Sequence, residues 1–428
     1  MATPGRLSPV SHGPLLPWSS MPLSLLPPLS GTTTWRRRRR EPLHSPKKMG
    51  GDEPASFLFS LVSIKRNKET SLRTKVAWEE RKIFNSFTCN SSLFDDGAAL
   101  GAENDADFKV HVLSSLEVLD RLHDQRISKA ETFLAMYSSI FGGIVFDPAM
   151  MAIPVDDHMV HRGHGVFDTA IIFDGYLYEL DAHLDRLLRS ASAAKIISPF
   201  SRATLRSILL QLTAASSCRK GRLRYWLSAG PGDFFLSPAA CHPAFYAVVI
   251  EDDFFQCKQG VEVITSTIPM KAPLFATMKN VNYLPNVLSK MEAEASGAFS
   301  SLWVDGEGCI AEGPNMNVAF ITHDKELILP PFRKILQGCT AKRLLELAPV
   351  LIEQGRLKSV RVADLRVEEA KRSAEMMYAA SGLPLLPIIK WDGEPVGDGR
   401  VGELTMALSD LLWRDMLEGP ESHRTLVP

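Results

Sequence analysis

One lysine stands in a segment whose composition favours its use as a nucleophile. Lys279 follows Met278 and precedes Val281 in a turn-rich stretch ahead of an expected helix. The nearest acidic residue along the chain is Glu292. In such apolar surroundings an amine is favoured in its neutral form and can form a Schiff base with a carbonyl carbon. Most other lysines are expected to be solvated surface charges, so the setting distinguishes Lys279.

A glutamate follows in a turn that is rich in glycine and asparagine. Glu312 comes after the short apolar run Ile310–Ala311, and the turn ends at Asn317. A turn carboxylate is usually an ordinary surface charge, but a buried one can hold a pyridine nitrogen protonated. If Lys279 and Glu312 share a site, the pair predicts an enzyme that uses pyridoxal 5'-phosphate (PLP).

Two other places have residues suited to an anion. Gly338, Cys339 and Thr340 precede an expected helix, which Thr340 is expected to cap. Free backbone N–H groups at a helix start favour an anion, although an ordinary cap is the commoner case. Arg186 lies one helical turn after His183 and would bind a phosphate with two hydrogen bonds, unless it pairs with a neighbouring aspartate.

A histidine run invites a metal interpretation, which we do not adopt. His158, His161 and His164 are spaced by three, but the run leads into a glycine-rich strand entry and no second ligand cluster appears. We therefore predict no metal. Arg162 and His164 are instead candidates for binding a substrate carboxylate.

The composition is ordinary for a soluble globular protein, with 428 residues, 45% hydrophobic, 23% charged and a formal net charge of -1. No basic stripe outside the first fifty residues indicates nucleic acid as a partner. No apolar run approaches the roughly 18 residues of a membrane helix. The six cysteines are scattered without a CxxC, which favours reduced thiols in an intracellular compartment.

Residues 1–48 have the composition of an organelle transit peptide. No Asp or Glu occurs from Met1 to Arg40, and this hydroxyl-rich stretch ends in the run Arg36–Arg40. A nuclear-localisation run or plain disorder are the alternatives. Residues 49–132 show no sustained period and are expected to form a disordered linker, apart from a short helix near Leu113–Leu122.

Beyond Phe133 the patterns predict two segments, 133–255 and 256–418, followed by a tail at 419–428. The linker between them is placed at Gln256–Gly260. In the first segment we expect strands at Val166–Phe173, Tyr176–Tyr178, Leu223–Leu227 and Phe245–Ile250, and a helix at Leu180–Ile196.

In the second segment we expect strands at Val261–Thr265, Leu302–Val304, Cys309–Ala311, Val318–Thr322, Glu326–Leu329 and Leu386–Trp391. Helices are expected at Leu284–Ala298 and from Thr340 toward Gln354, the latter kinked or split at Pro349. Hairpins without a clean βαβ alternation predict an α/β protein of the α+β kind, with largely antiparallel or mixed sheets.

Several motifs occur together and in a fixed order: Val155–His158, Arg162–Thr169, His183–Leu187, Lys279–Tyr283, Glu312–Val318 and Gly338–Arg343. Jointly they resemble the fold-type IV PLP enzymes, which include branched-chain and D-amino-acid aminotransferases and aminodeoxychorismate lyase. The chain is most similar to the plant plastid D-amino-acid transaminase-like group, from roughly Phe133 to Met416. The resemblance implies two α/β domains with PLP in the cleft between them, usually in a homodimer whose partner chain helps close the substrate site.

The resemblance also implies roles for single residues. Lys279 matches the Schiff-base lysine, which moves a proton between the substrate Cα and the cofactor C4′. Glu312 matches the carboxylate on the pyridine nitrogen, and Arg186 matches the phosphate-binding arginine. Cys339 and Thr340 match the phosphate contacts at a helix start.

Other contacts are carried over more loosely. Asn317 is predicted as a further cofactor residue of the Glu312 turn. The late loop, which is rich in Ser and Thr in bacterial relatives, reads Ala379 to Pro384 here and leaves Ser381 or Gly382 as its phosphate contact. Arg224 and Trp226 occupy the strand that carries substrate residues in those relatives.

The predicted function is transfer of the amino group of D-amino acids to 2-oxo acids through a Lys279 Schiff base, in the plastid stroma, with the cytoplasm as the alternative location. Aminodeoxychorismate lyase activity, which forms 4-aminobenzoate and pyruvate, is the second hypothesis, and a branched-chain aminotransferase is the third. A non-catalytic PLP-binding protein is the alternative from another class. The joint presence of Lys279, Glu312 and Arg186 argues against it.

Overall fold

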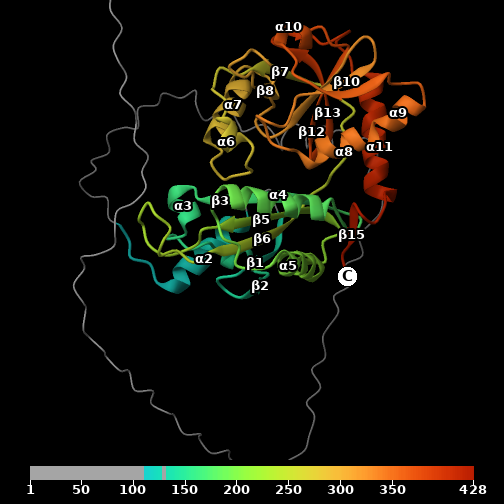
Figure 1. Cartoon of the computed structure of the whole chain (residues 1–428). Helices are drawn as coiled ribbons and strands as arrows, with labels where there is room; N and C mark the ends of the chain where they lie inside the picture. Colours follow the sequence, from blue (N-terminus) through green and yellow to red (C-terminus); the bar gives the residue numbers. More distant parts are fainter. Residues whose placement is uncertain (1–109, 128–131) are drawn as a thin grey trace, which may run out of the picture. The chain divides into compact units, whose positions relative to one another are not determined.

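Two β-sheets organise the residues that the computed structural model describes, which are 110–127 and 132–428 (Figure 1). The expected transit segment and most of the expected linker lie outside the described residues. The described residues belong to one compact unit. The helix expected near Leu113–Leu122 is present as α2, Ser115–Ile127.

The first sheet is antiparallel throughout and has the strand order β15-β4-β3-β5-β6-β1-β2. Its strands are β1 (Thr132–Ser138), β2 (Gly143–Val145), β3 (Gly165–Phe173), β4 (Tyr176–Tyr178), β5 (Lys220–Ser228), β6 (Ala244–Glu251) and β15 (Arg424–Leu426). The tight β3–β4 turn forms because Asp174 and Gly175 both adopt positive φ, as the Asp-Gly pair predicts.

Two helices, α4 (Leu180–Ala193) and α5 (Arg202–Ser216), pack with this sheet in one apolar core. In α4 the buried residues Leu180, Leu184, Leu187 and Ala191 recur at helical spacing, so one stripe of the helix is buried. A 3-10 turn (Pro148–Met150) and the short α3 (His158–Arg162) precede β3. The helix α5 was not anticipated from the sequence.

The second sheet is mixed and has the order β11-β10-β9-β12-β13-β7-β8, with β14 (Glu394–Pro395) beside β13. The strands are β7 (Val261–Thr265), β8 (Ser300–Leu302), β9 (Asn317–Ile321), β10 (Glu326–Leu329), β11 (Ser359–Val362), β12 (Glu375–Ala380) and β13 (Leu383–Trp391). Pairs β7–β8, β7–β13 and β10–β11 are parallel, and the others are antiparallel. This arrangement confirms the expectation of antiparallel and mixed sheets.

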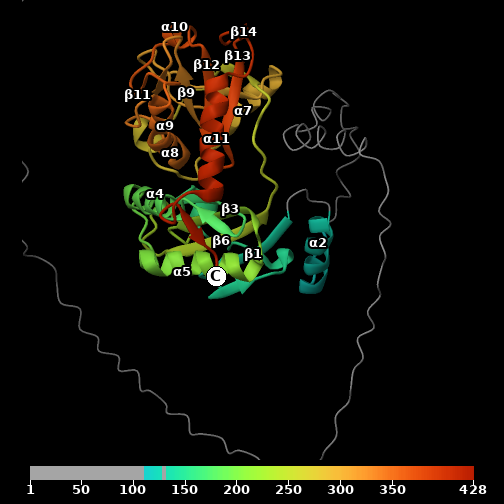
Figure 2. The same cartoon turned by 90° about the vertical axis from the view of Figure 1, so that its right-hand side faces the viewer.

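Three helices share a core with one face of the second sheet: α8 (Cys339–Leu347), α9 (Pro349–Glu353) and α11 (Glu403–Glu418). Figure 2 shows α11 lying along this sheet. The remaining helices are α6 (Pro273–Ala276), α7 (Leu284–Ala295) and α10 (Val367–Ala370). Pro349 divides α8 from α9, as expected, because it lacks the backbone N–H that would continue the first helix.

Two expectations are wrong, one about the start of a helix and one about the C-terminal segment. The helix start is not capped by Thr340: α8 begins at Cys339, and Gly338 is its N-cap without a side-chain hydrogen bond. The segment 419–428 is not merely a tail, because Arg424–Leu426 pair with Tyr176–Tyr178 as β15. The final strand therefore returns to the first sheet.

A buried ionic cluster joins elements of both sheets' layers. Arg343 of α8 donates to the two Asp415 oxygens of α11 at 2.9 and 2.6 Å, and Tyr178 of β4 donates to the same carboxylate at 2.5 Å. Burial alone would raise the pKa of Asp415, but the hydrogen bonds from Arg343 and Tyr178 hold it below its usual value. The cluster helps to fix β4 relative to α8 and α11.

Candidate active site

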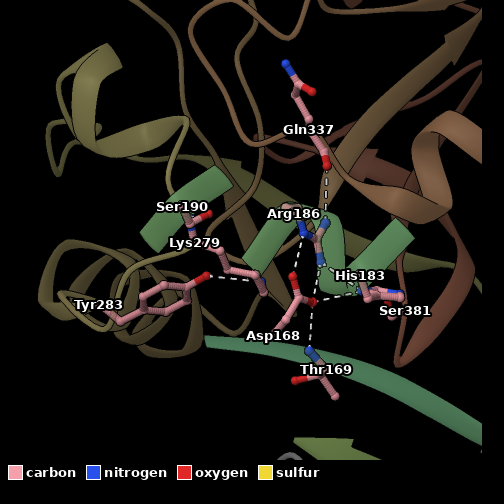
Figure 3. A network of polar contacts seen from close by, with 9 residues as sticks. All are labelled: Asp168, Thr169, His183, Arg186, Ser190, Lys279, Tyr283, Gln337 and Ser381. Carbon is pink, nitrogen blue, oxygen red and sulfur yellow. Dashed lines mark hydrogen bonds and ion pairs between the residues drawn. The ribbon is translucent and has the colours of Figure 1, made fainter. Parts of the chain in front are cut away.

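The backbone at Lys279 is held between β3 and α4. The residue lies in the segment between α6 and α7, and its carbonyl accepts from the N–H of Phe167 at 2.9 Å. Its own N–H donates to Ser190 Oγ of α4 at 3.1 Å (Figure 3). Nearby, the Val281 N–H donates to the Gly165 carbonyl at 3.1 Å. These bonds fix the position from which the Lys279 side chain leaves the backbone.

The Lys279 ammonium lies against two aromatic rings. Its Nζ is 4.8 Å from the centre of the Phe167 ring and donates to Tyr283 Oη at 3.4 Å. The two rings meet nearly edge to face, with centres 5.2 Å apart. The amine is half-buried, and the apolar setting expected from the sequence is present.

Glu312 is a buried carboxylate held mainly by neutral donors. Its oxygens accept from Asn317 Nδ2 at 3.1 Å and from the Leu336 N–H at 3.3 Å. Burial raises the pKa of Glu312 to about 8, although the Leu336 N–H and the charges of Lys271, Lys279 and Arg186 act to lower it. Glu312 therefore lies within electrostatic reach of both the lysine and the arginine singled out in the sequence.

Arg186 and His183 of α4 converge on Asp168 of β3 (Figure 3). Arg186 Nε and Nη2 donate to the two Asp168 oxygens at 2.8 and 2.7 Å, and His183 Nδ1 lies 2.8 Å from the same carboxylate. Burial would raise the pKa of Asp168, but Arg186 and His183 hold it well below its usual value. Asp168 thus fixes a buried guanidinium in one orientation.

The charge of His183 is set by its neighbours. Burial would lower the pKa of this imidazole, but Cys339 and Asp168 raise it to about 9. In turn, burial would raise the pKa of the Cys339 thiol, but the positive charges of His183 and Arg186 lower it. The region around the start of α8 is therefore electropositive and suited to an anion.

The start of α8 meets this charged network. Arg186 Nη1 donates to the Gln337 carbonyl at 3.2 Å, immediately before the N-cap Gly338. Thr340 and Ser381 line one pocket with His183, and Ser381 Oγ lies 3.4 Å from His183 Nε2. The structure thus brings Arg186, Cys339, Thr340 and Ser381 together, with backbone N–H groups of a helix start among them.

Gly338 is required by a close approach. A Cβ added there would lie 2.0 Å from Asn317 Oδ1. Asn317 is buried and donates from Nδ2 to Glu312 and, at 3.0 Å, to the Leu336 carbonyl. Asn317 therefore connects the carboxylate turn to the start of α8.

The four residues predicted for substrate binding separate into two groups. The Arg224 guanidinium on β5 lies 4.8 Å from the Phe167 ring centre, the same ring that Lys279 approaches, and 5.7 Å from that of Trp226. Arg162 donates to the Phe234 carbonyl at 2.7 Å. His164 Nε2 lies 2.8 Å from the Ala194 carbonyl oxygen. Arg224 therefore approaches the same ring as Lys279 and also lies over Trp226, whereas Arg162 and His164 have contacts elsewhere.

Three residues of this region carry no role in the sequence analysis: Asp168, Lys271 and Phe167. Asp168 and Phe167 belong to a quoted motif, and an aspartate within an otherwise apolar strand is itself a signal of a buried partner. Lys271 stands outside every motif. Among the described residues no cluster of His, Cys, Asp and Glu could hold a metal ion, and no helix there is long and apolar enough to cross a membrane.

Comparison with known proteins identifies the family. The family model of class IV amino-transferases matches residues 165–391. The chain is 58% identical over 323 residues to a chloroplastic D-amino-acid transaminase of Arabidopsis thaliana, covering 75% of this chain and 86% of that one. It is 26% identical over 284 residues to a D-alanine aminotransferase of Bacillus licheniformis, covering 65% and 96% of the two chains.

Among solved structures, the fold is similar to that of a branched-chain aminotransferase of Thermoproteus uzoniensis crystallised with norvaline. The TM-score is 0.63 at 19% identity, over 69% of this chain and 100% of that one. A second branched-chain amino acid aminotransferase, crystallised with pyridoxamine 5'-phosphate, gives a TM-score of 0.64 at 20% identity, over 69% and 99% of the two chains. At these identities the likeness concerns the fold. Together with the family model and the Arabidopsis relative, it shows that the chain belongs to the class IV aminotransferases, a family of PLP-dependent enzymes.

Proposed function

We propose that this enzyme transfers the amino group of D-amino acids to 2-oxo acids, with PLP held at Lys279. The observation that carries the proposal is the buried Glu312 carboxylate within electrostatic reach of both Lys279 and Arg186. The names of the relatives, D-amino-acid transaminase and D-alanine aminotransferase, support the choice of D-amino acids.

The residues present fit this cofactor at three points. A protonated ring nitrogen would supply the positive charge that the buried Glu312 carboxylate needs at close range. Arg186, the Thr340 hydroxyl and the first N–H groups of α8 suit a phosphate dianion. The Lys279 amine is half-buried beside aromatic rings, where a covalent bond to an aldehyde carbon is shielded from water.

Each residue then has a distinct task. When bound, PLP supplies a carbonyl carbon for amino groups and a ring that accepts electrons. Lys279 Nζ would hold that carbon until the substrate amine replaces it, and would then move the proton from the substrate Cα to that cofactor carbon. Glu312 would keep the ring nitrogen protonated, and Asp168 would orient Arg186 toward the phosphate. Asn317, Cys339 and Ser381 would complete the binding site.

The proposal is tested with purified protein and separated substrates. D-alanine and L-leucine are each supplied with 2-oxoglutarate, and aminodeoxychorismate is supplied alone. We expect turnover of D-alanine, visible absorbance from bound cofactor, and loss of both in Lys279→Ala but not in Lys358→Ala, an exposed control. Full activity in Lys279→Ala contradicts the role of Lys279. Turnover restricted to L-leucine or to aminodeoxychorismate would replace the substrate assignment by the branched-chain or lyase alternative.

We infer that the active form is a homodimer, because α7 carries an exposed apolar stripe. Leu284, Val287, Leu288 and Met291 recur at i, i+3, i+4 and i+7 and are 67, 49, 42 and 50% exposed. The helix begins directly after Tyr283 of the site. Such a stripe normally faces a partner. A second copy covering α7 would also shield the neighbouring Tyr283 from water.

We also infer delivery to the plastid. The acid-free, hydroxyl-rich composition of residues 1–48 is typical of transit peptides, and the Arabidopsis relative is named as chloroplastic. A fluorescent protein fused after residue 132 is expected in plastids of leaf cells. The same fusion starting at residue 49 is expected in the cytoplasm.

A further inference from the structure

A second lysine lies beside the one proposed to hold the cofactor. The Lys271 ammonium, in the loop before α6, is 4.7 Å from the centre of the Tyr283 ring. The Lys279 ammonium is 5.9 Å from the centre of the same ring. Tyr283 is therefore approached by two cations, only one of which has a task in the proposed chemistry.

Lys271 has no carboxylate of its own. Among residues 110–127 and 132–428, its ammonium makes no ion pair and no hydrogen bond, and its contact is the face of Tyr283. Burial lowers the pKa of Lys271; the negative charge of Glu312 opposes this effect, and the nearby Lys279 adds to it. A half-buried ammonium with no carboxylate in direct contact is unfavourable, and an arriving anion relieves that cost.

Three other cations around the site are engaged elsewhere, whereas Arg224 stacks on the Phe167 and Trp226 rings. Arg186 is fixed by Asp168 at the start of α8. Arg162 contacts the Phe234 carbonyl, and His164 contacts that of Ala194. An amino acid that reacts at Lys279 carries its carboxylate on the carbon that bears the amino group. A cation for this carboxylate must therefore lie close to the Lys279 amine.

We propose that Lys271 binds the α-carboxylate of both the amino-acid donor and the 2-oxo-acid acceptor beside Lys279. This rests on the proposed function, because that function supplies the carboxylate. An ammonium is a compact point charge that accepts carboxylates in several orientations. Such tolerance suits a site that must bind a tetrahedral donor carbon and a planar acceptor carbon in turn.

The test uses cofactor-loaded protein and two unreactive probes of one shape, butyrate and its neutral analogue butyramide. Titration calorimetry measures the dissociation constants for wild type, Lys271→Met, Lys271→Arg and the exposed control Lys358→Met. We expect Lys271→Met to weaken butyrate binding about tenfold or more, as for loss of a charged hydrogen bond. Lys271→Arg should recover part of the loss, and butyramide binding should not change.

Two results would overturn the proposal. One is butyrate binding by Lys271→Met that equals wild type. The other is equal loss for butyrate and butyramide, which would mean that Lys271 only shapes the site. If butyrate binding is unchanged but the pH dependence of the cofactor absorbance changes, Lys271 acts on Glu312 and not on the substrate, and this form of the first result also overturns the proposal. Failure of the wild type to show cofactor absorbance contradicts the proposed function itself, so the two failures are distinguishable.

Discussion

Burial disfavours the charged form of Glu312. Its partners are the Asn317 amide and the Leu336 N–H, with Lys271 and Lys279 acting through space. Asp168 is also buried but has two hydrogen-bonded cations, so its charge is favoured. This difference fits two roles: among the described residues Glu312 lacks a hydrogen-bonded cation and can bind a cationic ligand, whereas Asp168 orients Arg186.

This difference predicts a pH dependence of stability in the cofactor-free protein. The pKa of Glu312 is about 8 in the folded chain against 4.5 for the ordinary group. Between these values the folded state binds more protons, so the free energy of unfolding falls as pH rises. The slope due to this group is at most about 1.4 kcal/mol per pH unit. The substitution Glu312→Gln removes this contribution to the pH dependence of the free energy of unfolding.

The measurement is urea unfolding of cofactor-free wild type and Glu312→Gln at several pH values across that window. Glu307→Gln, on an exposed turn, is the matched control. The stability difference between wild type and Glu312→Gln should shift in favour of the variant as pH rises. A difference that stays constant across the window would show that Glu312 titrates normally.

At the residue scale, the sequence predicted those site residues that can be recognised from their neighbours along the chain. Lys279 and Glu312 stand in recognisable local surroundings, and the structure places them within electrostatic reach of each other. Lys271 and Asp168 acquire their setting from residues outside their own local segments, namely Tyr283, Glu312 and Arg186 of α4. No pattern within one segment contains that information.

Among the elements, the start of α8 contributes most to the site. Its N-cap, Gly338, has no side chain that would occupy the free N–H groups, and it leaves room for Asn317. Thr340 was the expected cap because hydroxyl residues are preferred at this position. The close packing of Gly338 on Asn317 comes from β9 and was not visible in the local sequence.

Gly338→Ala is therefore expected to damage the cofactor site. The added Cβ must displace Asn317, which holds Glu312. We expect the dissociation constant of PLP, measured by absorbance, to rise about tenfold, and stability to fall by about 1–3 kcal/mol. In Gly306→Ala the added Cβ meets open space, so this control should behave as wild type. Unchanged cofactor affinity in Gly338→Ala would show that the start of α8 does not contribute to cofactor binding.

Whole sheets were harder to anticipate than single strands. The predicted bounds of β4, β7 and β10 match the observed ones, because alternating residues and flanking turn residues mark where these strands begin and end. The helices α5 and α11 and the strand β12 were missed, and β15 was taken for a tail. The β15 pairing joins Arg424–Leu426 to Tyr176–Tyr178 across more than half of the chain, a contact that local periodicity does not encode.

At the scale of the whole molecule, the exposed stripe on α7 predicts a dimer that the enzyme needs. Val287→Glu combined with Leu288→Glu places two charges on the stripe without touching the buried residues of α7. We expect the dimer dissociation constant to rise at least about tenfold and activity to fall with it. Ile352→Glu on α9 is the control, since this residue is also partly exposed and apolar.

Light scattering during size-exclusion chromatography, across a concentration series, measures this equilibrium. A double variant that stays dimeric and fully active would show that α7 faces solvent in the working enzyme. A monomer with full activity would show that the site is complete within one chain.

The central claim is that Lys279 holds the cofactor, and one measurement tests it directly. The purified protein is reduced with borohydride, which fixes an amine-bound cofactor permanently, then digested and examined by mass spectrometry. The account predicts a single phosphopyridoxyl group on Lys279. The same group on Lys271 or on any other lysine, with Lys279 unmodified, would contradict it.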